Sequence, residues 1–245
     1  MAFADHFDGY LLLHSPRLAP ERLPLARQAL AGIGLSEVEC VAPVEVSAAQ
    51  LAESAYQRVA VLSVLRSLKA CIELAEQRGW QHFVFLEDDV CFHPAFARHW
   101  QALESGLQGL DWGLLTLHRW PVRTREVVVR GSLLGRAHWM QVEHNSGGQV
   151  MIFRRDFYRP MLETLSACER LGWPADFCYG MLSQSHPGRV FCSSLNLSGQ
   201  RGGLLSSVQQ GLRRGGSHYA RFRSSHCWVD YVLVNLAAWL RDRLR

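Results

Sequence analysis

Segments of strand character alternate with segments of helical character along the first half of this 245-residue chain, and this alternation constrains its fold most strongly. A short apolar run at 8–14 suits a buried strand. Residues 23–30 have helical character and end at a Gly32-x-Gly34 break, and 38–46 is a second predicted strand. Such alternation favours a mostly parallel sheet that is covered by helices on both faces. We therefore expect the α/β fold class, as a single Rossmann-like domain that spans residues 1–245.

The clearest helix is predicted from Ser47, a good N-cap residue, to Arg78. Its apolar residues recur at steps of three and four and mark one buried face: Val61, Leu62, Leu65, Leu68 and Ile72. Gly79 stands where a glycine in the left-handed conformation would end the helix. The aromatic and β-branched segment 81–86 then predicts a further strand.

The rest of the chain continues the pattern and then departs from it. The remaining predicted elements are a helix at 94–106, a strand at 112–117, a hairpin or irregular excursion at 127–140, a strand at 149–153 and a helix at 156–171 capped by Asp156. A segment rich in Gly, Ser and Gln follows at about 199–217, where we expect a mobile loop or lid. An amphipathic helix is expected at about 226–245, either docked on the domain, which we favour, or lying on a membrane surface.

Composition narrows the class of protein. Hydrophobic residues make up 48% and charged residues 20%, as in an ordinary soluble globular protein, and a net charge of +4 is too small to predict a nucleic-acid partner. The seven cysteines are odd in number and form no C-x-x-C, which favours reduced thiols. The first ten residues have no basic region followed by an apolar stretch, so they do not resemble a secretory signal. We expect a cytoplasmic protein, either free or peripheral at the inner membrane surface.

Three consecutive carboxylates, Glu87, Asp88 and Asp89, directly follow the apolar strand predicted at 81–86. Like charges in a row repel one another and resist burial, and a divalent cation would remove that penalty. Residues two apart in an extended chain point to the same side, so Glu87 and Asp89 can share one target. Carboxylate oxygens suit Mg²⁺ or Mn²⁺, which often also bind substrate phosphates. The alternative is that the cluster caps the next helix and faces water, although a cap needs only one such residue.

Other residues carry weaker signals, each with an ordinary alternative. His218 or His226 could supply a further metal ligand, but histidines are more often surface or core residues. The arginines at 201, 213 and 214 could bind a diphosphate, or they could belong to a solvated basic loop. The tryptophans at 120, 139 and 173 could stack on sugar rings, or they could simply be buried.

Four ordered segments together resemble glycosyltransferase family 25, the lipopolysaccharide-type glycosyltransferases. They are the LEDDV element at 86–90 with its preceding helix and strand, the segment GGQVMIFRR at 147–155, Pro174-Ala175-Asp176, and QRGGLLSSV at 200–208. The resemblance covers about residues 8–209. It implies a nucleotide-sugar-binding domain of the A-type glycosyltransferase fold.

The resemblance also implies an activity and roles for the residues that match. It implies that a hexose, galactose-like, moves from a UDP-sugar to a saccharide or glycolipid acceptor with inversion. Glu87 would contact the ribose or sugar hydroxyls of the donor, Asp89 would bind the metal and Asp88 would support or share it. Apart from the resemblance, Arg201 is the arginine that we expect to contact the donor diphosphate. Inversion needs a base near the acceptor hydroxyl, and Asp176 is the candidate for that base, with a helix cap as an equally open role.

Two other classes remain open at this point. A metal-dependent phosphohydrolase could use the same carboxylates, but no second Asp-rich cluster follows Asp111. A catalytically idle homologue could bind a sugar or nucleotide only, although such a protein would be expected to lose the acidic motif, which is intact here.

Overall fold

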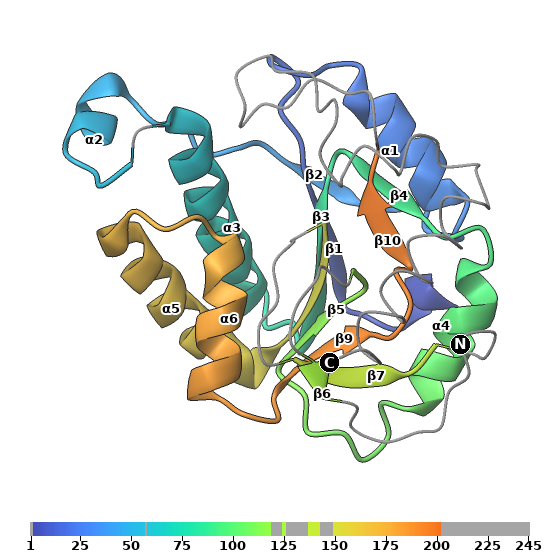
Figure 1. Ribbon diagram of the computed structural model, residues 1–245. Helices are drawn as coiled ribbons and strands as arrows, with labels where there is room; N and C mark the ends of the chain where they lie inside the picture. Colours follow the sequence, from blue (N-terminus) through green and yellow to red (C-terminus); the bar gives the residue numbers. More distant parts are fainter. Residues whose placement is uncertain (1, 57, 119–123, 126–136, 143–148, 202–245) are drawn as a thin grey trace, which may run out of the picture.

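The computed structural model describes residues 2–56, 58–118, 124–125, 137–142 and 149–201. An eight-stranded sheet has the order β2-β1-β3-β8-β5-β9-β7-β6, and β10 and β4 form a small second sheet (Figure 1). The strands are β1 (Gly9–Leu13), β2 (Glu39–Val41), β3 (His82–Glu87), β4 (Val90–Phe92), β5 (Leu114–Thr116), β6 (Thr124–Arg125), β7 (Trp139–Val142), β8 (Val150–Arg154), β9 (Val190–Ser193) and β10 (Ser198–Gln200). The helices are α1 (Arg22–Ala31), α2 (Ala48–Ala52), α3 (Val59–Gln77), α4 (Phe96–Ser105), α5 (Tyr158–Leu171) and α6 (Asp176–Ser185), with short 3₁₀ turns η1 (Phe3–Asp5) and η2 (Arg155–Phe157).

The strand directions confirm the expected α/β class. β1 pairs in parallel with β2 and with β3, and β5 pairs in parallel with β9. β8 runs antiparallel between β3 and β5, and its two antiparallel pairings leave those two neighbours pointing the same way. The strand predicted at 149–153 is therefore present, but its reversed direction was not predicted.

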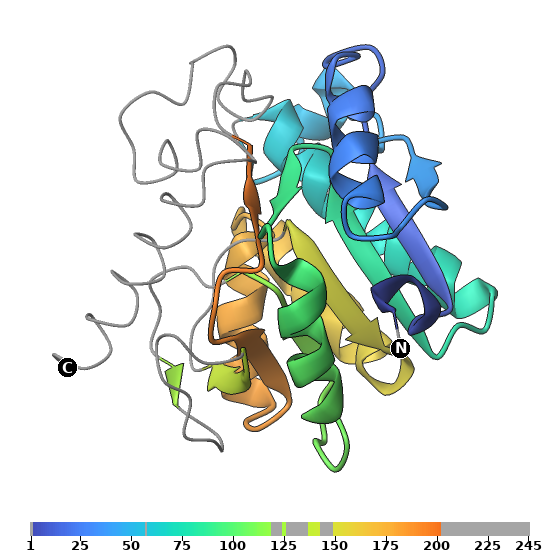
Figure 2. The same ribbon diagram turned by 90° about the vertical axis from the view of Figure 1, so that its right-hand side faces the viewer.

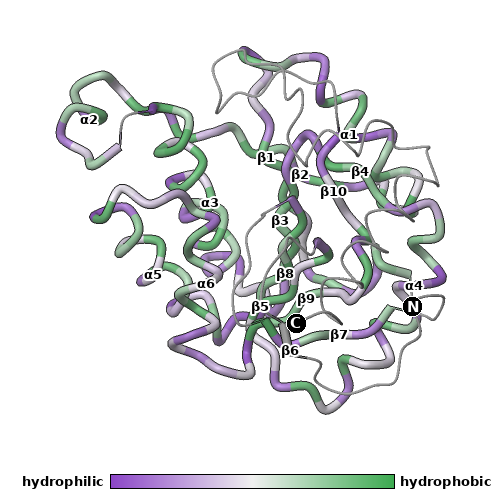
Figure 3. The backbone as a smooth tube through the Cα atoms, in the orientation of Figure 1, coloured by the Kyte–Doolittle hydropathy of each residue, from purple (hydrophilic) through white to green (hydrophobic). Residues whose placement is uncertain are grey.

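Helices cover both faces of the sheet, as Figures 1 and 2 show. On one face, α3, α5 and α6 pack over strand residues such as Leu11, Phe83 and Phe153. On the other face, α1 and α4 pack over the alternate residues of the same strands, among them Leu12 and Val84. Both faces of β1 are thus buried, which explains why its sequence ends in the apolar run at 11–13 rather than alternating. Figure 3 shows green, hydrophobic stretches along the central strands.

The single helix predicted from Ser47 to Arg78 is wrong in its first part, because the chain forms α2, leaves the helix and starts again as α3. Ser47 does cap α2, within a capping box completed by Gln50. The Ser54 hydroxyl then donates to the Leu51 carbonyl at 2.8 Å and accepts from the Tyr56 N–H at 3.2 Å. Such local side-chain bonds compete with the helical backbone. The Tyr56 hydroxyl in turn donates to the main-chain carbonyls of Cys168, in the last turn of α5, and of Trp173, just beyond it, so a tertiary contact fixes the break.

Two predicted helix ends have different outcomes. Gly79 lies just beyond α3 with φ of +71°, which confirms it as the glycine that ends the helix. Asp156 is not the cap of α5. It lies in η2, and its carboxylate accepts bonds from Arg154 and from Arg189 instead. An ion pair with two arginines has replaced the expected capping bond.

In the small sheet, the last described residues of the chain pair with a strand that directly follows the acidic cluster. β10 pairs antiparallel with β4, with Gly199 opposite Cys91 and Gln200 opposite Val90. The first residues of the segment predicted as a mobile loop at 199–217 therefore belong to a strand. The rest of that segment and the helix expected at 226–245 lie outside the described residues. Within the described ranges, no helix is long and apolar enough to cross a membrane.

Candidate functional site

The acidic cluster lies at the carboxyl end of β3, in the turn that leads to β4. Glu87 is the last residue of β3 and is half-buried, with its N–H donating to the Gln149 carbonyl at 3.1 Å. Asp88 and Asp89 form the turn and are only 8% and 6% exposed. Leu13, the last residue of β1, pairs with Glu87, so the ends of these two parallel strands meet here. This edge is where open α/β sheets commonly bind ligands.

Asp88 is held by two side chains from the first part of the chain. Its Oδ2 lies 2.9 Å from Nδ1 of His14, the residue that follows β1. Its Oδ1 accepts a bond of 2.9 Å from Nη1 of Arg22, the first residue of α1. Both oxygens of Asp88 therefore have partners within the protein. One carboxylate of the acidic cluster therefore has a buried arginine as its ion-pair partner.

The guanidinium of Arg22 is the buried positive charge that pairs with Asp88 in this site. Burial opposes its charged form, but the bond to Asp88 and the charges of Asp89 and Asp88 outweigh burial and raise the pKa of Arg22. The cation therefore persists although the side chain is almost wholly enclosed. A buried arginine is costly to assemble unless its charge is paired, and here its Nη1 lies 2.9 Å from Oδ1 of Asp88.

Arg201 contacts Asp89 through a hydrogen bond between their main chains. Its N–H donates to the Asp89 carbonyl at 2.7 Å, immediately after β10. Its Nη2 donates to the Leu25 carbonyl in α1 at 3.4 Å. The fold thus joins the predicted residues Glu87, Asp88, Asp89 and Arg201 at one edge of the sheet, with α1 as the common neighbour.

Asp176 is the first residue of α6 and is exposed. The N-cap position belongs to Ala175, which makes no side-chain capping bond, so Asp176 does not hold the cap position itself. Because α6 leads into β9, which is parallel to β5, the start of α6 lies toward the carboxyl edge of the sheet (Figure 1).

The buried phenol of Tyr179 links Asp176 with the acidic turn. Burial raises the pKa of Tyr179 well above its usual value, and the charges of Asp176 and of Glu87 act in the same direction. Both carboxylates therefore lie within electrostatic reach of one phenol.

The carboxylate oxygens of the acidic cluster are suitable ligands for a divalent cation. Among the residues that the structure describes, no three His, Cys, Asp or Glu side chains gather as a metal-binding group. Mg²⁺ and Mn²⁺ are often bound by one or two carboxylates together with substrate phosphates, and Glu87 and Asp89 offer two. Asp88, whose oxygens contact His14 and Arg22, suits a supporting role better than direct coordination.

One candidate from the sequence, Trp139, does not enter this site. Trp139 is buried in β7, where its Nε1 donates to the Leu103 carbonyl at 2.9 Å, so it is a core residue. His218, His226, Trp120, Arg213 and Arg214 lie outside the described residues.

His14, Arg22 and Tyr179 were missed by sequence reasoning. His14 follows directly on an apolar strand, as the acidic cluster does, and that shared position was the available signal. Nothing local marks Arg22 or Tyr179.

Comparisons with known proteins give only distant likenesses. No protein-family model matches the chain, and no curated protein matches its sequence. A glycosyltransferase involved in glycosylation of the major capsid of PBCV-1 has 14% identity and a TM-score of 0.42, covering 75% of this chain and 80% of its own. Mouse xyloside xylosyltransferase 1 has 10% identity and a TM-score of 0.41, covering 74% and 83%. At such values the likeness adds no argument about activity, which depends on the residues of this chain.

Proposed function

We propose that this protein is an inverting, metal-dependent glycosyltransferase that moves a hexose, galactose-like, from a UDP-sugar to a saccharide or glycolipid acceptor of the lipopolysaccharide type. The observation that carries the proposal is the buried acidic turn after β3, held by His14 and Arg22 at the carboxyl edge of the sheet. A family 25 assignment is part of the proposal and is supported by the four ordered sequence segments.

The three carboxylates have separate tasks in this proposal. Asp89, together with Glu87, would hold Mn²⁺ or Mg²⁺, and Glu87 would also contact the donor hydroxyls. Asp88 fixes the turn through His14 and Arg22. The bound cation would neutralise charge on the departing diphosphate. Arg201, whose backbone is bonded to Asp89, adds positive charge on the diphosphate side. Rigid support for the turn matters because misplaced charges contribute little to catalysis.

Asp176 acts as the general base. Its carboxylate takes the proton of the acceptor hydroxyl while that oxygen forms a bond to the anomeric carbon. The bond between the anomeric carbon and the diphosphate oxygen breaks on the opposite side, which inverts the configuration. Tyr179 stays protonated in its buried position, so its phenol adds no further negative charge near these carboxylates.

The test is nucleotide release from a panel of UDP- and GDP-sugars in Mn²⁺, with product analysis. We expect one UDP-sugar to be consumed, slowly with water alone and faster with a saccharide acceptor, and activity to be lost in EDTA. Hydrolysis of simple phosphate esters in place of sugar transfer would favour a phosphohydrolase. Binding of a UDP-sugar without turnover would favour an idle homologue.

A further inference from the structure

The corner between α5 and α6 exposes aromatic surface beside Asp176. Trp173 is 42% exposed and Phe177 is 58% exposed, and their ring centroids lie 5.8 Å apart with the planes inclined by 42°. Most large apolar side chains of the described chain are buried, so two adjacent exposed rings are unusual here. Exposed apolar patches commonly mark interaction surfaces.

The backbone of this corner is held in place, so the exposure does not reflect a loose loop end. The Tyr56 hydroxyl lies 3.1 Å from the Cys168 carbonyl and 2.5 Å from the Trp173 carbonyl. Gly172 has φ of +68°, and a Cβ there would lie 2.6 Å from the Ala55 carbonyl oxygen. The chain between the two helices is thus packed against the segment after α2. A fixed backbone that presents two rings to solvent is suited to binding, because little ordering cost remains to be met on contact.

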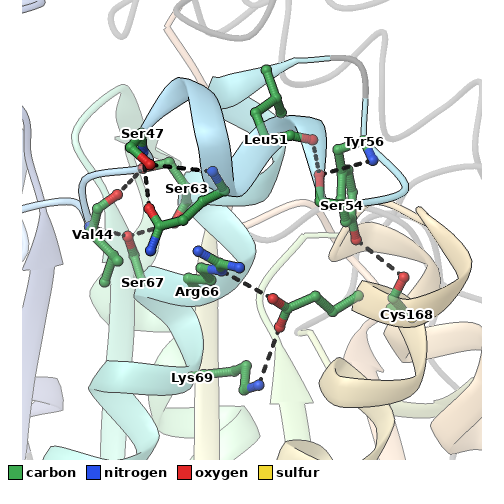
Figure 4. A network of polar contacts seen from close by, with 12 residues as sticks. Val44, Ser47, Leu51, Ser54, Tyr56, Ser63, Arg66, Ser67, Lys69 and Cys168 are labelled. Carbon is green, nitrogen blue, oxygen red and sulfur yellow. Dashed lines mark hydrogen bonds and ion pairs between the residues drawn. The ribbon is translucent and has the colours of Figure 1, made fainter.

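A polar cleft borders the same corner. It has a volume of about 580 Å³ and lies between α2 and α5, with Ala55, Arg66, Glu169 and Arg170 among its lining residues. The carboxylate of Glu169 accepts bonds from Arg66 at 2.9 Å and from Lys69 at 3.2 Å, which fixes that wall of the cleft (Figure 4). The surface therefore changes from apolar rings to polar groups within a few residues.

We propose that Trp173 and Phe177 form a stacking platform for a sugar ring of the acceptor, with the cleft between α2 and α5 receiving the polar remainder of the saccharide. A pyranose has an apolar face of C–H groups and a polar rim of hydroxyls, and this surface offers aromatic rings beside charged and polar side chains. Asp176 lies between the two rings in the sequence, so a stacked sugar would bring a hydroxyl near that carboxylate. This inference depends on the proposed function, since it assigns the acceptor side of the same site.

The surface favours a saccharide over a lipid bilayer. An anionic membrane attracts Lys and Arg beside exposed tryptophan. Here Asp176 is one of the residues between Trp173 and Phe177 in the sequence, and its carboxylate would be repelled by anionic headgroups. Leu171, 53% exposed, shares the corner and provides a matched control, because an aliphatic side chain adds apolar area without an aromatic face.

The test is saturation-transfer NMR on the whole protein with methyl β-galactoside and lactose as probes. We expect signals from the ring C–H protons of one face in wild type and in Leu171→Ala. Trp173→Ala and Phe177→Ala should each weaken binding about fivefold to tenfold, the usual worth of an aromatic contact, and Trp173→Phe should restore most of it. Because these side chains are exposed, each variant should keep the wild-type melting temperature. If Trp173→Ala does not fold, saccharide binding by Phe177→Ala alone tests the platform.

Other results would overturn the platform. They are absence of any saccharide signal in wild type, equal loss in Leu171→Ala, or binding to vesicles of anionic phospholipid that depends on Trp173 and Phe177. Hydrolysis of the donor by water is measured on the same variants. If hydrolysis persists in all of them while saccharide binding does not depend on the rings, the platform fails and the transferase proposal stands. If no donor is consumed but the rings bind saccharide, the proposed function fails instead.

Discussion

Asp88 and Asp89 are neighbours in sequence and equally buried, yet their contacts differ. Asp88 contacts His14 and Arg22 through its side chain, whereas Asp89 is reached by Arg201 through its main-chain carbonyl. The first contact ties the turn to β1 and α1, and the second ties it to β10. The two aspartates should therefore respond differently to substitution, one in stability and the other in ligand binding.

We expect Asp88→Ala to destabilise the protein by about 3 kcal/mol, because removing one partner of a buried ion pair leaves the other charge uncompensated. The urea midpoint measures this. Glu163→Ala is the matched control, since Glu163 pairs with Arg159 on the surface of α5, where an exposed pair contributes about 0.5 kcal/mol. Equal midpoints for the two variants would contradict a structural role for Asp88.

Asp89→Asn should keep the fold and weaken UDP binding in Mn²⁺, because a neutral amide is a poorer ligand for a divalent cation. Isothermal titration calorimetry with and without EDTA is the measurement. Glu163→Gln, a neutralised surface carboxylate, should bind as wild type does. Unchanged affinity in Asp89→Asn, or full affinity in EDTA, would rule out a metal site at this turn.

Asp176→Asn should lower turnover on the order of a hundredfold while leaving UDP affinity nearly intact, because a general base acts in the transfer step. A residue that merely stabilises the start of α6 would behave otherwise. Its loss would lower the melting temperature and leave the single-turnover rate per folded molecule unchanged. Measuring both quantities on one preparation separates the two roles.

Among single residues, the sequence predicted the three carboxylates of the turn but not His14 and Arg22, which contact Asp88. Three carboxylates after an apolar strand are visible in the local pattern, so Glu87, Asp88 and Asp89 could be named. The partners of Asp88 lie more distant in the chain, and only the parallel pairing of β1 with β3 brings His14 beside it. A single sequence carries no record of such a pairing.

Among the elements, the corner between α5 and α6 depends on one glycine. Gly172→Ala should destabilise the protein for two reasons: the residue has φ of +68°, and its new Cβ would contact the Ala55 carbonyl. Gly109→Ala is the control, because Gly109 has φ of +79° with open space around it. It reports the backbone strain alone, about 1 kcal/mol. We expect a lower melting temperature for Gly172→Ala than for Gly109→Ala, and equal values would refute the close packing of this corner.

The elements also show where local patterns stop being informative. The apolar face of α3 was predicted from periodicity, and its end was predicted from Gly79. Both could be predicted because both depend on residues close together in the sequence. The break before α3 was not predicted, since it depends on contacts of Tyr56 with the main chain at and just after the end of α5. The reversed direction of β8 was not predicted either, because a buried apolar strand reads alike in both directions.

Across the whole molecule, buried imidazoles make stability depend on pH. Burial lowers the pKa of His6, His82, His93, His99 and His118, and the pKa of His93 falls to about 4. These groups bind protons more readily in the unfolded chain, whose histidines titrate near 6.5, so their contribution is complete above that pH. As pH falls from about 6.5 toward 4, the unfolded state takes up more protons and stability declines.

We expect the urea midpoint to fall steadily between pH 7 and pH 5. His93→Asn should flatten this slope, because an amide does not titrate and its oxygen can still accept the Ala95 N–H that now bonds to Nδ1. An unchanged slope in His93→Asn would show that His93 is not among the groups that set it.

The pairing of β10 with β4 also determines when, during protein synthesis, the acidic turn can form all of its contacts. A chain leaves the ribosome from its amino end, and its domains fold as they emerge. Asp89 emerges early, whereas the Arg201 N–H that bonds to its carbonyl stands at the end of the described residues. A half-made chain would already carry the three carboxylates without that bond. Translation must therefore pass Arg201 before the turn takes its final form, so a prematurely terminated chain would lack the completed site.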